Sequence, residues 1–365
     1  MKKNLGLLAA CQGLYLTNNV TFIAINGLVG LALAPLGWMA TLPVMAYVVG
    51  GALSTKAVAI TQERFGRKAS FQAGLAVALA SALLCAYAAV SRNFWLLCFA
   101  TLVAGYYNAN AILYRFAAAE LATPAARTRD LSSVPFVGAY LALAGVALLA
   151  MLLMLFIDFP PTPVRTSSHD GKPLAEIMRQ PVFIVAAISG ALGYGVMNLL
   201  MAATPIAMQQ YSLPFSDAAF VLQWHVIGMF APGFFTGNLI KRFGPLPVMG
   251  VGVALNLACI LVALSGVEVH QFLVSLFLLG VGWNFLFTGS TTLSLSAYGP
   301  QERDRAQGAL NFFVFATMAV SSLASGVLVT TQGWTLLNYG SLVPVALTGA
   351  ALLWLGRKTA RQATA

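Results

Sequence analysis

The chain has little charge. Asp, Glu, Lys and Arg make up 8% of its 365 residues, against about 25% in soluble globular proteins. Its ten acidic residues all fall in loops or at the edges of apolar runs, so no carboxylate stands near the centre of a run. This distribution argues against a soluble domain, and it also argues against an active site built from paired carboxylates.

The chain also lacks the common motifs of metal and thiol chemistry. Its four cysteines (Cys11, Cys85, Cys98 and Cys259) lie inside apolar runs and form no CxxC pair. Neither an HExxH motif nor a DxxxD pair occurs. Buried, small, apolar side chains are the simplest interpretation of the cysteines. We therefore predict no enzyme activity, no cofactor and no metal site.

Long apolar runs dominate what is present, and the mean hydropathy is +0.82. Eleven runs have the roughly 20 residues needed to cross about 30 Å of hydrocarbon as a helix. They span 5–33, 38–60, 70–90, 94–119, 134–157, 182–208, 218–240, 245–267, 271–298, 307–330 and 334–356. Strands of a membrane β-barrel would be about 10 residues long and would alternate. The sequence therefore predicts an all-α polytopic membrane protein with about 11 transmembrane helices.

The distribution of Lys and Arg residues predicts a membrane topology that differs from the one given by eleven crossings. With the N-terminus in the cytoplasm, strict alternation puts eleven Lys and Arg residues outside and seven inside, against the positive-inside rule. One further crossing between Asp130 and Val134 would put seventeen inside and one outside. The charges thus indicate a twelve-helix protein with one helix missing near residue 131. A natural deletion, an altered gene model and a genuine eleven-helix topology are all open explanations.

A short basic turn occurs twice, half a chain apart. The copies are Glu63-Arg64-Phe65-Gly66-Arg67-Lys68 and Lys241-Arg242-Phe243-Gly244, and membrane-length runs flank both. The repeat predicts two related halves that rock about a central site, as in secondary transporters. We expect an N-terminal half-bundle over 1–157, a cytoplasmic linker over 158–181 and a C-terminal six-helix half-bundle over 182–365.

On these residues the chain resembles the major facilitator superfamily, whose members have twelve helices in two six-helix halves. That family carries G-x-L-x-[DE]-R-x-G-[RK]-[RK] between its second and third helices. Here Glu63 to Lys68 matches the later part of the motif, while Ala59 and Thr61 replace the leading Gly and the Leu. The second copy keeps four positions: Gly237, Leu239, Arg242 and Gly244. The resemblance implies that the missing helix is the fifth.

The family resemblance also implies a role for the basic turns. In the family this turn makes charge contacts between helices and stabilises one face of the transport cycle. The same gating role is expected here for Glu63, Arg64, Gly66, Arg67, Arg242 and Gly244. The alternative is that both turns only anchor the topology.

Polar side chains inside the runs are costly in hydrocarbon and tend to face a bundle interior or a watery cavity. Several recur at helical spacing on one face of a run. We predict a solute cavity lined by Gln12, Tyr15, Asn19, Asn26, Tyr107, Asn110, Tyr114, Tyr194, Asn198, Trp283, Asn284 and Thr288. In the family the first, fourth, seventh and tenth helices line the cavity, and these residues lie on the corresponding runs. Hydrogen bonds between neighbouring helices are the alternative role.

Two basic side chains are candidates for coupling or charge recognition. His225 lies near the middle of the run 218–240, and its ordinary titration range suits proton exchange. The alternative for His225 is a neutral ring bonded to a neighbouring helix. Arg115 could receive an anionic group, pair with Glu120 or extend to the membrane interface.

These features predict a secondary-active transporter that moves a small organic solute by alternating access, with proton coupling as one option. The Tyr, Trp and Asn lining suits a neutral or mildly polar solute, including one with an aromatic ring. The stretches 223–225 and 229–237 resemble a bacterial branch of the superfamily associated with vitamin uptake, which suggests riboflavin. A drug or metabolite efflux carrier and a truncated member that no longer transports are the alternatives.

The expected location is the bacterial cytoplasmic (inner) membrane, with multiple crossings and a cytoplasmic N-terminus. The expected partners are a small-molecule solute and the lipid bilayer, and we expect a monomer. The net charge of +10 does not indicate nucleic acid, because the Lys and Arg residues sit in short loops where charge sets topology and meets anionic headgroups.

Overall fold

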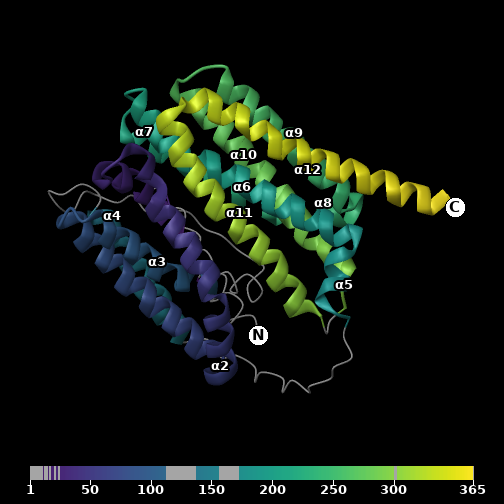
Figure 1. Cartoon of the computed structure of the whole chain (residues 1–365), viewed down its shortest axis with the longest axis horizontal. Helices are drawn as coiled ribbons and strands as arrows, with labels where there is room; N and C mark the ends of the chain where they lie inside the picture. The colour runs from purple at the N-terminus through teal and green to yellow at the C-terminus, as the bar shows by residue number, and fades with distance from the viewer. Residues whose placement is uncertain are drawn as a thin grey trace. The chain divides into compact units, whose positions relative to one another are not determined.

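The protein is helical wherever the structure describes it. The computed structural model describes residues 11, 15, 18–19, 22–23, 25–111, 137–155, 172–299 and 302–364, and these contain helices and turns but no strand. The all-α prediction is thereby confirmed. The chain divides into two compact units, Met1–Arg165 and Thr166–Ala365 (Figure 1).

The first unit consists of long helices that pack lengthwise. The described residues from 11 to 33 are helical, and we call them the first helix. The elements that follow are η1 (Gly37–Thr41), α2 (Leu42–Val90), α3 (Phe94–Ala111) and α4 (Val137–Leu155). Two membrane-length segments make up α2, and they meet at Gly66, whose φ of 80° and ψ of 164° interrupt the helix. Both α3 and α4 pack against α2.

The ends of α3 and α4 lie at the same end of this unit. Asn110, one residue before the end of α3, accepts a hydrogen bond from the Ser70 hydroxyl at 2.9 Å. Two residues further along α2, Gln72 donates to the carbonyl of Met151 near the end of α4 at 3.0 Å. The two helices therefore finish beside the same short stretch of α2.

The start of α4 lies at the opposite end. Tyr140 donates from its hydroxyl to Asn26 of the first helix at 2.8 Å, whereas Cys11 of that helix contacts the carbonyl of Ala150 with its sulfur at 3.9 Å. The first helix and α4 are thus antiparallel. It follows that α3 and α4 run in the same direction.

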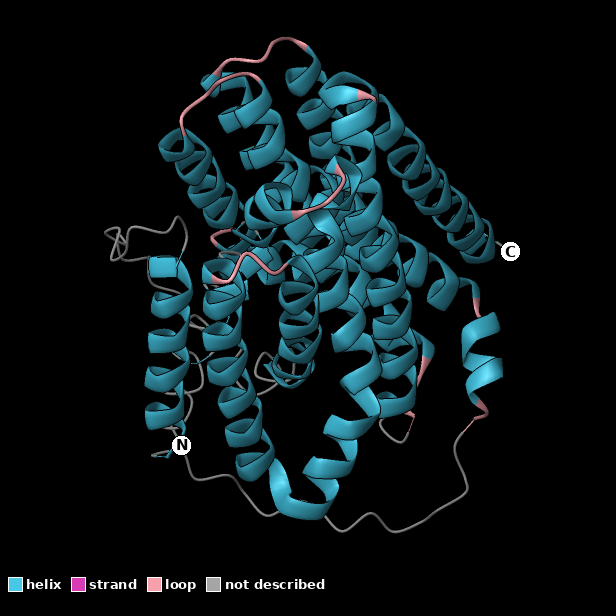
Figure 2. Cartoon of the chain, turned by 60° about the vertical axis from the view of Figure 1, so that its left-hand side comes forward, coloured by secondary structure: helices cyan, strands magenta, loops and turns pink. Residues whose placement is uncertain are grey.

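The second unit is a bundle in which α6 and α10 each contact more of the other elements than the remaining helices do. Its elements are α5 (Leu174–Arg179), α6 (Pro181–Gln210), α7 (Phe215–Phe230), α8 (Gly233–Phe243), α9 (Pro245–Leu264), α10 (Val269–Ser294), η3 (Leu295–Ala297), α11 (Arg303–Thr331) and α12 (Gly333–Thr364). Helix α10 packs against α6, α7 and α9, while α6 also packs against α11 and α12. Figure 2 shows the helices of this unit joined by short loops.

Eight helical segments in the described parts of the chain are long and apolar enough to span a membrane. They are Gly37–Thr55, Lys68–Val90, Pro181–Gln210, Phe215–Phe243, Pro245–Leu264, Val269–Ala297, Arg305–Thr331 and Gly333–Arg361. Each corresponds to one of the runs expected from the sequence. The three remaining runs, 5–33, 94–119 and 134–157, each extend beyond the described residues.

A carboxylate holds the short helix α5 to the rest of the second unit. Glu302 accepts hydrogen bonds from the backbone N–H of Lys172 at 3.0 Å and from that of Gly299 at 2.8 Å. The Lys172 N–H is the main cause that lowers the pKa of Glu302. Ile177 of α5 is buried beside Phe183, so α5 is fixed by both polar and apolar contacts.

Replacing Glu302 by glutamine is expected to lower the melting temperature of the purified protein at neutral pH, because the two N–H groups bond to different carboxylate oxygens, and in glutamine an NH2 donor takes the place of one of them. The depressed pKa means that the carboxylate stabilises the fold above the ordinary value of 4.5. That contribution is lost as the pH falls below 4.5 through the folded-state value. The difference between wild type and Glu302→Gln should therefore shrink at acid pH. Equal melting temperatures at pH 7 would contradict the role.

Candidate functional site

The residues predicted to line a cavity fall into two groups, one in each unit. Three predicted side chains, Gln12, Tyr114 and Arg115, lie outside the described residues, as do the side chains of Glu63 and Arg67. The others occupy described positions on the first helix, α3, α6 and α10.

In the first unit the predicted residues bond across helices. Tyr15 donates to the Asn108 side-chain oxygen at 2.5 Å, and its ring meets the ring of Tyr107 edge-on at 5.6 Å. Asn19 accepts from the Tyr47 hydroxyl of α2 at 2.7 Å. Asn108 and Tyr47 were not among the predicted residues, although Asn108 is adjacent to Tyr107.

Two predicted amides of the first unit are fully buried. Asn26 donates to the carbonyl of Phe22 at 2.7 Å and accepts from the Tyr140 hydroxyl. Asn110 accepts from Ser70. Such bonds join helices within the unit, which is the alternative role that the sequence left open. Whether these amides also meet a solute stays a prediction.

In the second unit, four aromatic side chains from three helices form one cluster. Trp283 and Phe287 of α10 stack with ring centroids 5.3 Å apart and planes at 8°. Tyr194 of α6 meets both rings edge-on, each at 5.3 Å, and Phe230 of α7 meets Trp283 edge-on at 5.9 Å. We call Tyr194, Phe230, Trp283 and Phe287 the aromatic cluster.

Sequence reasoning found half of this cluster. Phe287 was missed, although it follows Trp283 by four residues and so shares its helix face. Phe230 was also missed because it comes from α7, and only the packing of α7 on α10 brings it to Trp283. Thr288, a predicted lining residue, is half-buried next to Phe287 on α10.

Asn198 lies between α6 and α11. Its amide nitrogen is 2.9 Å from the Ser321 hydroxyl, 2.8 Å from the Ser322 hydroxyl and 3.3 Å from the carbonyl of Met318. Its side-chain oxygen is buried and has no hydrogen-bond partner among the described residues. The amide thus fastens α6 to α11 and keeps one acceptor unused.

Asn284 of α10 makes hydrogen bonds to residues on both sides of the break between α7 and α8. Pro232 supplies no N–H and separates α7 from α8. Across this break, Asn284 of α10 donates to the carbonyl of Met229 and accepts from the Thr236 hydroxyl, both at 2.7 Å. Asn284 is therefore held by the α7–α8 break, where it supplies a donor to a carbonyl at the end of α7.

His225 is fully buried where α7 meets α10. Its Nδ1 lies 2.7 Å from the carbonyl of Leu276. A carbonyl oxygen can accept a hydrogen bond but cannot donate one, so Nδ1 carries a proton, and when the ring is neutral Nε2 presents a lone pair. No described residue donates to that Nε2.

The two basic turns have the same backbone conformation. Gly66 has φ 80° and ψ 164°, and Gly244 has φ 83° and ψ 164°, a region open essentially to glycine alone. In both turns the preceding arginine lies over the neighbouring phenylalanine ring, Arg64 at 5.6 Å and Arg242 at 5.2 Å. Both arginines are exposed. Their gating role stays a prediction.

Matching residues recur at a nearly constant offset in the two units. Tyr15 and Asn19 precede Tyr194 and Asn198 by 179 positions, Gly66 precedes Gly244 by 178, and the pair 107–108 (Tyr-Asn) precedes the pair 283–284 (Trp-Asn) by 176. The ring contacts repeat as well. Tyr15 of the first helix meets Tyr107 of α3 edge-on, and Tyr194 of α6 meets Trp283 of α10 edge-on. The units are therefore built on one repeated plan.

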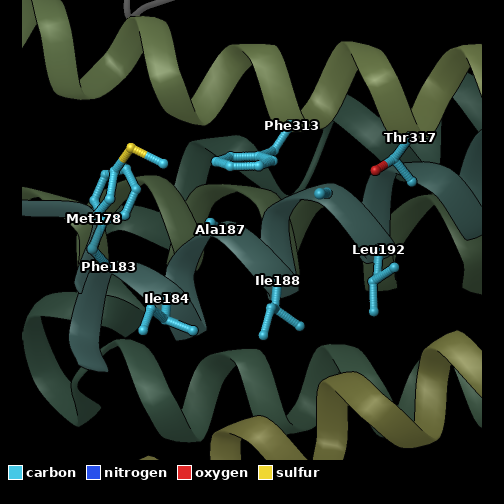
Figure 3. Close-up of a pocket in the computed structure, with 9 residues that line it drawn as sticks. Met178, Phe183, Ile184, Ala187, Ile188, Leu192, Phe313 and Thr317 are labelled. Carbon is cyan, nitrogen blue, oxygen red and sulfur yellow. The ribbon is translucent and has the colours of Figure 1, made fainter. Parts of the chain in front are cut away.

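An apolar groove with a volume of about 300 Å³ lies between α6 and α11. Figure 3 shows Phe313 and Thr317 of α11 pointing toward α6, along which Ile184, Ile188 and Leu192 follow one another. Thr317 supplies the only side-chain hydroxyl of its lining. None of the predicted site residues lines this groove, which suits a hydrocarbon chain better than a polar solute.

The described residues contain no group of three or more His, Cys, Asp or Glu side chains placed to hold a metal ion. The arrangement offers aromatic faces, amides and hydroxyls on helices of a membrane bundle.

The sequence profile of the Major Facilitator Superfamily matches residues 186–365. The riboflavin transporter RfnT of Brucella anthropi is 34% identical over 95% of this chain and 94% of its own length. The chain belongs to the Major Facilitator Superfamily. The uncharacterised MFS-type transporter YddS of Bacillus subtilis is 23% identical over 89% of this chain and 84% of its own length.

Solved structures of the superfamily have the same fold. The nucleoside transporter NupG matches with a TM-score of 0.71 and 12% identity over 96% of this chain and 98% of that chain. The human organic anion transporter MFSD10 matches with a TM-score of 0.67 and 14% identity over 96% and 99%. The prediction of a membrane transporter of this family is confirmed, and the protein is a transmembrane transporter.

Proposed function

We propose that this transporter carries riboflavin, or a solute built on the same ring, by alternating access of its two units. The observation that carries the proposal is its 34% identity to the riboflavin transporter RfnT over nearly the whole of both chains. The aromatic cluster and the uncharged polar residues of α6 and α10 support it. Riboflavin is uncharged, flat at one end and rich in hydroxyls at the other, which suits such a lining.

The experiment uses a bacterium that can neither make riboflavin nor take it up. Expression of the chain is expected to restore growth on low external riboflavin and uptake of the radiolabelled vitamin. Cells with the empty vector provide the background. Uptake equal to that background, with the protein detected in the membrane fraction, would overturn the proposal.

The proposed orientation places the N-terminus, Arg165 and Ala365 in the cytoplasm of a bacterial inner membrane. The parallel course of α3 and α4 supports it, because an N-terminus inside then puts the end of α4 inside as well. The positive-inside rule asks for the same result. Reporter fusions after Arg165 and at Ala365 should both give cytoplasmic signals, whereas periplasmic signals would mean an inverted second unit.

We further propose that the first unit lacks the counterpart of α11. Helix α4 bonds to the first helix and to the part of α2 after Gly66, and its equivalent by contacts is α12, which packs on α6 and α9. The alignment with RfnT supports a deletion. Since 95% of this chain is about 347 residues, about 26 of the 373 aligned positions have no residue here. That is about one membrane helix.

His225 is the proposed proton-coupling residue, because its buried Nε2 has no partner among the described residues. The acidic and basic side chains of α7, α8 and α10 other than His225 lie near helix ends, at Asp217, Lys241, Arg242 and His270. His225→Gln keeps a donor for the Leu276 carbonyl but cannot be protonated. Uptake by this variant is expected to lose its pH dependence while exchange of labelled for unlabelled solute continues. An unchanged pH profile would remove His225 from coupling.

A further inference from the structure

The aromatic cluster of the second unit contains a buried donor for which the described residues supply no acceptor. The side chain of Trp283 is 6% exposed, and its indole Nε1–H has no acceptor among the described residues. Indole nitrogen is a donor only, and a buried donor without an acceptor destabilises the structure that holds it. Buried Trp N–H groups therefore usually have a partner.

The position of Tyr194 on α6 shows which side of the bundle the cluster occupies. Gly190 and Gly193 face α10, where an added Cβ would meet Ser290 and Leu286. Gly195 faces α11, where it would meet Thr317. At 100° per residue, Tyr194 falls between these two faces. The α12-facing side of α6 lies elsewhere, at Val185.

Within the second unit, Tyr194 therefore lies between the sides of α6 that α10 and α11 cover. Tyr194, Phe230 and Phe287 are half-buried, so each keeps part of its ring accessible. Trp283 lies in contact with all three. The combination is a partly open aromatic surface with one buried N–H beside it.

We propose that the aromatic cluster is the subsite for the planar ring of the transported solute, with Trp283 Nε1–H donating to an acceptor on the edge of that ring. The inference rests on the proposed function, because it assigns the ring of a riboflavin-like solute to these residues. Aromatic side chains bind flat rings through offset-stacked and edge-on contacts. A carbonyl oxygen or unprotonated nitrogen of the heteroaromatic ring completes the bonding of Trp283.

The assignment separates two parts of the solute. The cluster recognises the ring, and it offers no contact specific to a polyol chain. Lumichrome, which is the flavin ring without its ribityl chain, should therefore compete with riboflavin for the purified protein. Ribitol, which is the chain without the ring, should not compete at the same concentration.

The decisive variant is Trp283→Phe, which keeps an aromatic ring and removes only the N–H. Trp224→Phe is the matched control, because Trp224 is 41% exposed and contacts Phe220 and Phe277 away from the cluster. The measurement is riboflavin binding to purified, detergent-solubilised protein, followed by the quenching of flavin fluorescence. Trp283→Phe is expected to raise the Kd about tenfold, which corresponds to about 1.4 kcal/mol, while Trp224→Phe keeps the wild-type Kd.

The variant Phe287→Leu provides a second test that does not depend on how Trp283→Phe folds. This substitution is expected to raise the Kd for lumichrome and the Kd for riboflavin by the same factor. If wild type binds riboflavin and both cluster variants bind it equally well, the subsite assignment is overturned and the proposed function stands. If wild type binds no riboflavin, both are overturned. Competition by ribitol instead of lumichrome would also overturn the subsite.

Discussion

Replacing Gly105 by leucine is expected to abolish the folded protein. A Cβ at Gly105 would lie 2.3 Å from the carbonyl carbon of Gly50 and 2.3 Å from the nitrogen of Gly51. These are backbone atoms of α2, so no side chain can turn away to make room. A Cβ at Gly50 would in return lie 1.9 Å from the carbonyl oxygen of Leu102.

The energetic reason is that α2 and α3 touch backbone to backbone at this point. Overpacking an ordinary core site costs about 1–3 kcal/mol and sometimes more, whereas the whole stability of a domain is about 5–15 kcal/mol. Here the helices must separate along their length, which also removes the close packing that small residues allow in membrane bundles. We expect Gly105→Leu to exceed the usual range.

Size-exclusion chromatography of the detergent-solubilised protein measures this effect as the fraction that elutes as a single species. Gly145→Leu is the matched control, because Gly145 lies exposed on α4 of the same unit and an added Cβ there meets nothing within 4 Å. The control should behave as wild type. A monodisperse Gly105→Leu variant with the wild-type melting temperature would show that the α2–α3 contact is not as close as described.

Replacing Asn284 by leucine is expected to lower stability by roughly 1–3 kcal/mol and to reduce transport about tenfold or more. Leucine has a similar size and shape but cannot donate to the carbonyl of Met229. That carbonyl stands at the α7–α8 break, where Pro232 has no N–H to offer. In hydrocarbon an unsatisfied carbonyl is costly, so the break should rearrange.

Thr236→Val separates the two bonds of Asn284. It removes the hydroxyl that donates to Asn284 but leaves the bond to Met229. We expect a smaller loss of stability and near-normal transport from this variant. Melting temperatures and initial uptake rates of the two variants give the comparison. Equal effects of both substitutions would show that the Met229 carbonyl does not depend on Asn284.

The long elements of the fold were predictable because membrane helices follow directly from apolar length. Every run from 182 to 356 corresponds to a helix of the second unit. The basic turns were also predictable as breaks, since glycine is needed where φ is positive. The identical conformation of Gly66 and Gly244, in contrast, follows from the repeated packing and is not visible in either turn alone.

The candidate site was predictable only in part. Helical spacing selected Tyr194, which shares a face with Asn198, whereas Trp283 was selected because it is adjacent to the stripe that begins at Asn284. It could not select Phe230, which reaches Trp283 only through the packing of α7 on α10. It also could not tell whether an amide meets a solute or another helix. Asn26 accepts from the Tyr140 hydroxyl and Asn284 donates to the carbonyl of Met229, and tertiary structure sets such distant partners.

The membrane topology of the first unit needed both the charge pattern of the sequence and the helix directions seen in the structure. Charge counting asked for one more crossing near residue 131 but could not say how the neighbouring helices run. The bonds of Gln72 and Tyr140 fix the direction of α4. Together they support the proposal that the first unit ends on the side of the membrane where it begins.

The central claim is that this chain by itself moves a riboflavin-like solute across a membrane. Counterflow in proteoliposomes tests it most directly: purified protein is reconstituted, the vesicles are loaded with unlabelled riboflavin, and trace labelled riboflavin is added outside. The account predicts transient accumulation of label inside, well above protein-free vesicles and competed by lumichrome. Accumulation equal to that of protein-free vesicles, with the reconstituted protein shown to be folded, would contradict it.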